Sequence, residues 1–423
     1  MQLSEILESE RIKNARNSFK IAFQTYLINR EKAMEGVDLA RLKKELRRIR
    51  EFSIKNLQFL KSKAIENLKK HGINVFEARD AKEAKEILYD LIPAGEIVVK
   101  SKSNVINEIG IEEFKERNEI IETDCGDFLV QICEESGVHP ITPALHLKIE
   151  KMVEAIEKKF GVKLEKKPEE IVKWVKNYLR EKIYRAKIGL TGANIISADG
   201  SIFIIENEGN ISLVSRLPEK HIIVASIDKI VSSNEDGMII CKALAIYGSG
   251  ASMPTYINVI SSPSKTADIQ KQIVYGAHGP KEIYLILLDN GRSKAIENGL
   301  EEILYCINCG SCLYFCPVYR QIFDNYGYKY FGGRGISLVY LIFGIEKAFD
   351  SGLFYCTTCS ACKEECPLDI DVPHLMKKIR EIAAKNNLTT KTNLGMIENL
   401  ESVGNPFGEA PKEGVIPEKL YCC

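Results

Sequence analysis

The sequence predicts an α/β domain built on a mainly parallel sheet, followed by an all-helical, cysteine-rich module. Seven short apolar runs alternate with amphipathic stretches between residues 72 and 290, and this strand signal stops after residue 292. Eight of the 13 cysteines then fall into two groups with identical spacing. A chain of 423 residues is also longer than one hydrophobic core usually supports, so we expect more than one domain.

Residues 1–71 are predicted to form a helical arm. Apolar residues recur at intervals of three and four among many charged residues, as in Leu39, Leu42 and Leu46, which is the period of an amphipathic helix. The first 30 residues contain no long apolar stretch of the secretory type, so we expect a cytoplasmic protein. We expect this arm and the C-terminal tail, residues 391–423, to contact partner subunits.

Residues 72–294 are predicted to form the α/β domain. Strands separated by helices favour a parallel sheet whose faces are covered by those helices. The predicted strands are 73–76, 97–99, 120–122, 202–205, 222–225, 257–260 and 283–288. Two long helices, 144–160 and 168–187, are expected to interrupt this order, the second with Pro168 at its first position.

The charge balance excludes some classes of partner. Lys plus Arg equals Asp plus Glu, at 58 each, so no global field attracts nucleic acid or an anionic membrane. The most apolar later segments, 283–288 and 336–345, are far shorter than the ~20 residues that cross a bilayer. We therefore expect neither nucleic-acid binding nor a transmembrane segment.

The two cysteine groups carry the strongest motif, C-x2-C-x2-C-x3-C-P, written twice. Three thiolates at intervals of three surround one [4Fe–4S] cubane, and the fourth, before proline, typically binds the other cluster. We expect one cluster on Cys306, Cys309, Cys312 and Cys366, and a second on Cys356, Cys359, Cys362 and Cys316. Zinc is the alternative, because CxxC pairs also bind zinc, but a structural zinc site does not need the repeated Cys-Pro.

Residues 295–390 are predicted to form a ferredoxin-like module of the all-helical type. The cysteines outside the motif are interpreted as ordinary thiols: Cys125, Cys133 and Cys241 as buried, Cys422 and Cys423 as exposed. Residues 404–423 are rich in proline and glycine and are expected to be extended. Trp174 is expected to pack in the core, on the apolar face of its helix.

With these residues in hand, the chain resembles the lactate-utilisation protein B family over roughly residues 70–385. The segments that carry the resemblance are 100–103, 122–124, 190–194, 206–210, 287–292, 306–312 and 317–320. The resemblance implies a lactate-utilisation (LUD) domain related to the CoA-transferase and ribose-isomerase fold. It also implies a role in oxidising lactate to pyruvate, together with sister subunits or a flavin-dependent lactate dehydrogenase. Ser360 departs from the glycine that the family commonly has.

Several loops of the α/β domain are candidate ligand sites, because parallel sheets hold ligands beyond the carboxyl ends of their strands. Lys100 and Lys102 suit an anion, although a solvated lysine-rich turn is the alternative. The other candidates are Thr191, Gly192 and Asn194, then Glu206, Asn207 and Glu208, and finally His278. Glu206 or Glu208 is a candidate nucleophile and His278 a candidate phosphate or metal ligand, whereas ordinary turns explain the same residues.

Together these features predict an iron–sulfur electron-transfer subunit of a lactate-oxidising complex. No GxGxxG fingerprint is present, so flavin or nicotinamide is expected on a partner. Two alternatives stay open. Residues 404–409 resemble a segment of heterodisulfide-reductase-like proteins, which favours a subunit of such a complex, and the LUD domain also suits a metabolite-sensing, redox-responsive binding protein.

Overall fold

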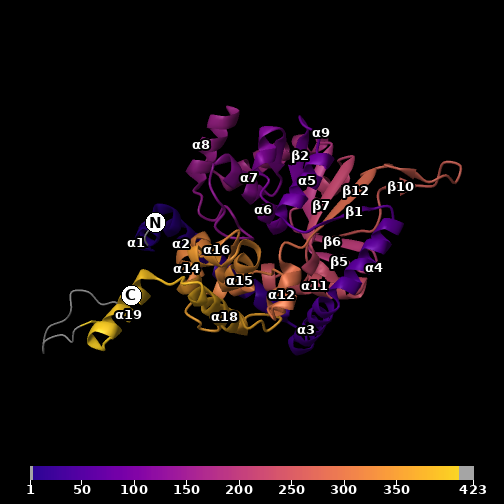
Figure 1. Cartoon of the computed structure of the whole chain (residues 1–423). Coiled ribbons are helices and arrows are strands. Elements are labelled where there is room, and N and C mark those ends of the chain that lie inside the picture. The colour runs from indigo at the N-terminus through magenta and orange to yellow at the C-terminus, as the bar shows by residue number, and fades with distance from the viewer. Residues whose placement is uncertain (1–2, 409–423) are drawn as a thin grey trace.

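The computed structural model describes residues 3–408. An α/β domain lies beside a helical module, and helices of the N-terminal arm run along both of them (Figure 1). None of the helices among the described residues combines the length and the apolarity needed to cross a bilayer.

The arm is helical, as its apolar period predicted. Its helices are α1 (Leu3–Glu8), α2 (Glu10–Met34), α3 (Leu39–Lys55) and α4 (Leu57–Lys70). Ser9 and Asp38 begin α2 and α3, and their side chains accept hydrogen bonds from the free amides of the first turn. Leu46 and Ile49 of α3 are fully buried, so the apolar stripe faces the core.

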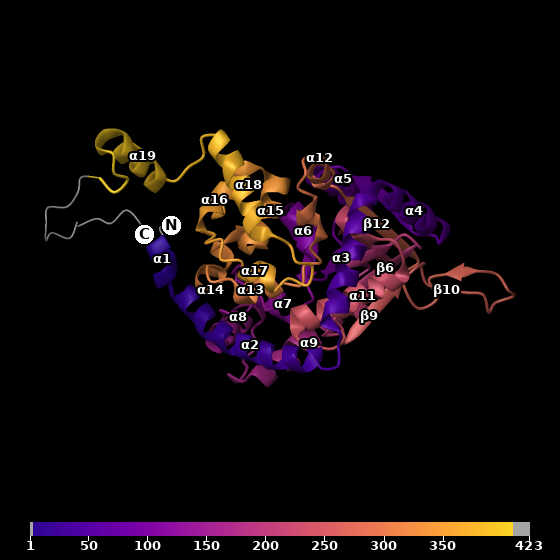
Figure 2. The ribbon, with the colours of Figure 1, turned by 90° about the horizontal axis from the view of Figure 1, so that it is seen from below.

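The aromatic face of α2 packs against the helical module of the same chain. The rings of Tyr26 and Tyr314 stack with centroids 4.0 Å apart, and the ring of Phe19 lies 5.5 Å from that of Phe323. Figure 2 shows α2 passing along α13 and α14 of the module. This face of α2 is therefore used inside the chain, whereas contacts of the arm with partner subunits stay a prediction.

The main sheet within the described residues has six strands in the order β1-β12-β7-β4-β2-β3, and every pairing is parallel. The strands are β1 (Asn74–Ala78), β2 (Ile97–Lys100), β3 (Glu119–Glu122), β4 (Ile188–Gly192), β7 (Lys220–Ser226) and β12 (Glu282–Leu288). His221–Ser226 of the central strand β7 are all buried, as a sheet covered on both faces requires. The predicted mainly parallel α/β domain is confirmed.

Helices cover both faces of this sheet. One face packs under α5 (Ala81–Leu91) and α6 (Asn104–Ile109). On the other face, α7 (Cys125–Ile132), α8 (Ile149–Phe160) and α9 (Pro168–Arg185) cover the half with β2 and β3. Trp174 of α9 packs there, stacked on Tyr178. Helix α8 begins later than residue 144, because His139 accepts the amides of Ile141 and Thr142 and holds that segment as a loop.

A second, four-stranded sheet covers the remaining part of that face. Its order is β8-β5-β6-β9, with strands β5 (Ile195–Ser197), β6 (Ser201–Glu206), β8 (Ile230–Val231) and β9 (Tyr256–Ile260). The predicted strands 202–205 and 257–260 therefore form, but the expectation that they join the parallel sheet is wrong. The tight turn at Gly200, with φ +90°, leaves no room for a crossover helix, so β6 pairs antiparallel with β5.

The C-terminal module is helical apart from one two-stranded pair, β13 (Gly327–Tyr328) with β14 (Tyr330–Phe331). Its helices are α12 (Arg292–Glu297), α13 (Ser311–Phe315), α14 (Tyr319–Ile322), α15 (Gly332–Phe343), α16 (Ile345–Asp350), α17 (Ala361–Glu364) and α18 (Val372–Lys385). One continuous core joins this module to α2, α3 and α11 (Asn234–Leu244). Beyond it, α19 (Lys391–Val403) stands away from the body and buries no residue (Figure 1). Residues 409–423 of the expected tail lie outside the described residues.

Candidate functional site

The two cysteine groups adopt the same local structure, a loop that leads into a short helix, α13 or α17. Asn308 and Gly310 of the first loop have φ of +60° and +81°, and Thr358 and Ser360 of the second have +53° and +68°. Backbone that alternates in this way turns consecutive amides inward, toward a negatively charged group. The Asn308 amide accordingly lies 3.2 Å from the sulfur of Cys306. Ser360 takes the glycine-like conformation despite its side chain.

The first set of neighbouring thiols joins the first loop to the last cysteine of the second group. Burial raises the pKa of Cys309, and the charges of Cys306 and Cys366 raise it further. Burial likewise raises the pKa of Cys312, followed by the charges of Cys309, Cys306, Cys362 and Cys366. Because charge interactions weaken with distance, Cys366 is a close neighbour of a loop more than 50 residues earlier in the chain.

The second set is complementary to the first. Burial raises the pKa of Cys362 to about 12, and Cys316, Cys356 and Cys359 add to this. These four cysteines and Cys312 line one small cavity of the module. The sulfur of Cys316 also accepts the amide of Tyr319 at 3.4 Å. Each cysteine loop therefore has thiols of the other group among its neighbours, including Cys362 beside Cys312.

This donor set fits iron–sulfur cubanes. Thiols on amide-lined loops provide the sulfur ligands and the N–H groups that stabilise a negatively charged cluster. Across residues 3–408, no three His, Cys, Asp or Glu side chains converge closely enough to hold a metal ion. A [4Fe–4S] cubane does not need side chains that converge on one ion, because each of its thiolates binds a different iron atom at the edge of the cluster.

A cavity of about 340 Å³ lies where the carboxyl ends of the main-sheet strands face the first cysteine loop. We call it the strand-end cavity. Its wall includes Ser101, Lys102 and Ser103 after β2, Gly192 and Asn194 around the end of β4, Glu206, Asn207 and Glu208 after β6, Lys229 after β7, and Ile307, Asn308 and Gly310 of the cysteine loop. The α/β domain and the cysteine-rich module thus share one cavity.

Comparison with known proteins identifies both parts. Residues 61–288 match the LUD domain and residues 302–370 match the 4Fe-4S dicluster domain. Lactate utilization protein B of Bacillus subtilis (strain 168) is 34% identical over 340 residues, which are 79% of this chain and 69% of that protein. The chain belongs to the lactate utilization protein B family.

Other relatives carry the same name. The protein of Geobacillus sp. (strain WCH70) is 33% identical, with 79% of this chain and 70% of the relative covered. That of Lysinibacillus sphaericus (strain C3-41) is 31% identical, with 91% and 80% covered. The crystal structure of a DUF162 family protein from Deinococcus radiodurans aligns with a TM-score of 0.31 at 13% identity, over 55% of this chain and 98% of that one.

In this lactate utilization protein B relative, two of the predicted ligand residues are engaged inside the main sheet. The Lys100 ammonium is buried and donates to both Glu122 carboxylate oxygens, at 2.7 and 2.9 Å. The Thr191 hydroxyl lies 2.8 Å from Nε2 of His221, and both residues are fully buried. Neither Lys100 nor Thr191 is among the residues that line the strand-end cavity.

Glu206 lines the cavity but is held by the protein. Its Oε2 accepts the Ile211 amide at 2.6 Å, and its Oε1 accepts the Ser212 amide at 2.8 Å. Asn258 also donates to Oε1, at 2.9 Å. These partners place the carboxylate at the beginning of α10 (Asn210–Arg216), where a negative charge stabilises the helix. The role of helix cap explains Glu206 without a catalytic function.

Asn194, Asn207 and Glu208 also hold neighbouring backbone at the cavity wall. Asn194 Oδ1 accepts the Ile205 amide at 2.9 Å, and Asn207 Oδ1 accepts the Thr255 amide at 3.1 Å. Glu208 accepts the Cys125 amide at 3.1 Å. Burial of its carboxyl group, and then the charge of Asp124, raise the pKa of Glu208 above its ordinary value.

His278 lies apart from these residues, in a separate groove with Ser264 and Arg216. Its backbone amide donates to the Ser264 hydroxyl at 3.2 Å, and its side chain is exposed. Of the cysteines outside the motif, Cys241 is buried as predicted, whereas Cys125 and Cys133 are partly exposed. Cys422 and Cys423 lie outside the described residues.

Two cavity residues, Ser101 and Lys229, were missed by the sequence analysis. Ser101 lies between Lys100 and Lys102, which were both predicted, and Lys229 lies in the mostly apolar run 222–231. A charged pair, Asp228 with Lys229, inside such a run was the available signal, because charged residues are rarely buried without a partner.

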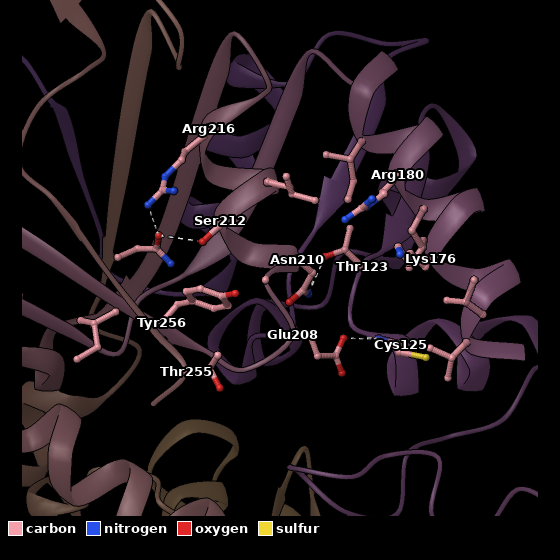
Figure 3. A pocket seen from close by; sticks show the side chains of 18 residues that line it. Thr123, Cys125, Lys176, Arg180, Glu208, Asn210, Ser212, Arg216, Thr255 and Tyr256 are labelled. Carbon is pink, nitrogen blue, oxygen red and sulfur yellow. Dashed lines mark hydrogen bonds between the residues drawn. The ribbon is translucent and has the colours of Figure 1, made fainter. Parts of the chain in front are cut away.

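A larger cavity of about 910 Å³ adjoins the strand-end cavity and shares Glu208 and Asn210 with it. Figure 3 shows Lys176 and Arg180 of α9 on one side and Ser212 and Arg216 of α10 on the other. Arg216 is already engaged, since it donates to Asn258 at 2.7 Å.

Proposed function

We propose that this chain is the iron–sulfur electron-transfer subunit of a lactate-oxidising complex. The observation that carries the proposal is the strand-end cavity, whose wall combines LUD-domain loops with Ile307, Asn308 and Gly310 of a cysteine loop. A ligand in this cavity lies directly beside the proposed cluster ligands. This arrangement suits electron transfer between a bound metabolite or partner and the module.

In this proposal the cysteines hold two [4Fe–4S] clusters with crossed ligand sets. Cys306, Cys309, Cys312 and Cys366 hold the first, and Cys356, Cys359, Cys362 and Cys316 hold the second. The two sets of neighbouring thiols described above support this assignment. When bound, each cluster supplies a one-electron acceptor, and two of them match the two electrons that leave lactate with two protons as pyruvate forms.

The neighbouring backbone prepares both sites for negative charge. The amides of Asn308 and Thr358 lie 3.2 and 3.4 Å from the sulfurs of Cys306 and Cys356. Such N–H groups favour the thiolate form that binds iron. Reduced thiols of this kind persist in the cytoplasm, where we place the protein. We assign the flavin step to a partner, a sister lactate-utilisation subunit or a flavin-dependent lactate dehydrogenase.

The test is anaerobic reconstitution of the full chain with iron and sulfide. We expect about eight iron and eight sulfide per chain, and cluster reduction by lactate only when partner subunits are added. Cys359→Ser should lower the iron content and change the electron paramagnetic resonance (EPR) spectrum. Cys241→Ser, which removes a buried thiol outside both sets, is the matched control. Zinc in place of iron, or unchanged iron in Cys359→Ser, would contradict the proposal.

The same shared cavity supports a second candidate, a metabolite-sensing protein whose clusters report redox state. Under that hypothesis a ligand changes the affinity for another protein without electron flow. Reduction of the clusters by lactate in the presence of the partners excludes it, whereas ligand-dependent partner binding without reduction favours it.

A further inference from the structure

The floor of the strand-end cavity is formed by three adjacent strands, β7, β4 and β2. Lys229 follows β7, Gly192 ends β4, and Ser101 follows β2. A Cβ atom on Gly192 would lie 2.5 Å from the Ser103 hydroxyl oxygen. Glycine at this position therefore leaves room for the Ser103 side chain against β4. The sheet order therefore places a lysine and a serine on either side of a glycine.

Lys229 brings a buried positive charge to this floor. Its side chain is 8% exposed, and within residues 3–408 its ammonium has one ion pair, at 3.4 Å from Oδ2 of Asp228. The other oxygen of Asp228 already receives Arg292 at 2.6 Å. Lys229 and Arg292 thus share the carboxylate of Asp228.

Cations outnumber carboxylates among the buried residues around Lys229. The buried cations are Lys229, Arg50, Arg292 and Arg334, and the buried carboxylates are Asp228 and Glu108. Arg50 donates only to backbone carbonyls in this network, to Tyr305 at 3.0 Å and to Leu304 and Asp228 at 2.6 Å each. An uncompensated buried charge is costly, and a bound anion would balance it.

Ser101 is an independent indication of a ligand. It is 1% exposed, and among the described residues its hydroxyl has no hydrogen-bond partner. Buried hydroxyl groups are nearly always hydrogen-bonded, so an unpaired one that lines a cavity indicates a missing partner.

The other charged side chains that line the cavity already contact partners within the protein. Lys102 lies 3.6 Å from both Asp124 and Asp127 and donates to the Ile141 carbonyl. Glu206 is held at the beginning of α10, as described above. Glu208 is the remaining carboxylate, at the exposed side of the cavity. The anion-binding side of the cavity is therefore the floor with Lys229 and Ser101.

We propose that the strand-end cavity binds a small 2-hydroxy- or 2-oxocarboxylate, with its carboxylate on Lys229 and Ser101 and its other end toward Asn308 of the cysteine loop. This inference rests on the proposed function and names the substrate class of that site. A buried ammonium beside an unpaired hydroxyl suits a carboxylate, and a cavity of about 340 Å³ has room for a small acid with water. Lys229 and Ser101 are binding residues with no part in electron transfer.

The experiment measures binding of pyruvate and of each lactate enantiomer to the reconstituted full chain by anaerobic calorimetry. Lys229→Met should weaken binding at least about tenfold, the loss expected for one charge-assisted hydrogen bond, and Ser101→Ala should weaken it a few-fold. Ser53→Ala is the matched control for the second variant, because Ser53 is also a buried serine with an unpaired hydroxyl but lies on α3. Lys100→Met is the control for loss of a buried ammonium outside the cavity.

Iron content and the EPR spectrum are recorded for every variant. Binding that weakens in the two cavity variants and not in the controls supports the inference. Equal binding in all variants, or no binding by a chain with full clusters, overturns it and leaves the proposed function standing. Inorganic phosphate that binds in a Lys229-dependent manner, while the carboxylates do not, overturns the substrate class. A chain without clusters contradicts the proposed function instead.

Discussion

Replacing Arg292 by methionine tests whether a buried ion network joins the α/β domain to the helical module. Arg292 is 2% exposed and donates to the two carboxylate oxygens of Glu108 at 2.9 and 2.8 Å, and to Asp228 at 2.6 Å. Tyr330 of the module also donates to Glu108, at 2.5 Å. Burial works against the charge of Arg292, but Glu108 and Asp228 outweigh it and hold the pKa of Arg292 well above its ordinary value.

The expected loss follows from what remains after the substitution. Breaking a buried pair by removing one partner costs about 3–5 kcal/mol, because a buried charge loses its compensation. Asn290 still donates to Glu108 at 2.7 Å, and Lys229 still pairs with Asp228, so we expect about 3 kcal/mol in the free energy of unfolding. Methionine fills a similar volume and keeps the loss from being a cavity effect.

The assay is urea unfolding, followed by far-ultraviolet circular dichroism and by cluster absorbance. Arg79→Met is the matched control, because Arg79 is 89% exposed and its pair with Glu83 lies in solvent, where an ion pair contributes little to stability. Equal midpoints for the two variants would refute the reasoning, since the buried network would then contribute no more than a surface pair.

Three further predictions follow from other features. Cys316→Ser and Cys366→Ser should each remove one cluster, and EPR spectra should show that the two variants lose different clusters. Burial lowers the pKa values of His139 and His221 to about 3, so between pH 6.5 and 3 only the unfolded chain binds these protons. For each histidine, the free energy of unfolding should therefore fall by about 1.4 kcal/mol per pH unit as the pH falls through that range, with no loss above pH 6.5. Urea unfolding at several pH values measures this dependence, which should be weaker in a His139→Gln variant. Gly189→Ala should destabilise the chain by at least about 1–3 kcal/mol, because its Cβ would lie 2.1 Å from the Val214 carbonyl oxygen, and thermal unfolding measures this.

The local elements were predictable because their signals are local. Continuous runs of apolar residues, as in β7 and β12, are typical of strands buried on both faces, and these strands lie inside the parallel sheet. Strand partners were not predictable in the same way. The run that became β6 has the same composition, yet the short turn before it forces an antiparallel pair, and a pairing choice of this kind depends on chain length between strands.

Part of the candidate site was predictable because its sequence signal is also local. The cysteine spacing points to its chemistry directly, because the ligands of one cluster lie within one loop and its partner motif. The strand-end loops were found through the rule on carboxyl ends, but the rule does not say which side chains face the cavity. Lys100 and Lys102 are two residues apart on an extended strand end. Lys100 forms an ion pair with Glu122, and only Lys102 lines the cavity.

The arm explains why the two parts of the chain act as one unit. Tyr26 donates to the Tyr247 carbonyl at 2.8 Å and lies 3.2 Å from the Ser311 hydroxyl, so α2 contacts both the helical turn that follows α11 and the first residue of α13. Arg50 of α3 donates to the carbonyls of Leu304 and Asp228, one from each part. These contacts fix the cysteine loop against the strand ends, the arrangement on which the proposed electron transfer across the strand-end cavity depends. The arm therefore positions the proposed site, although none of its residues lines that cavity.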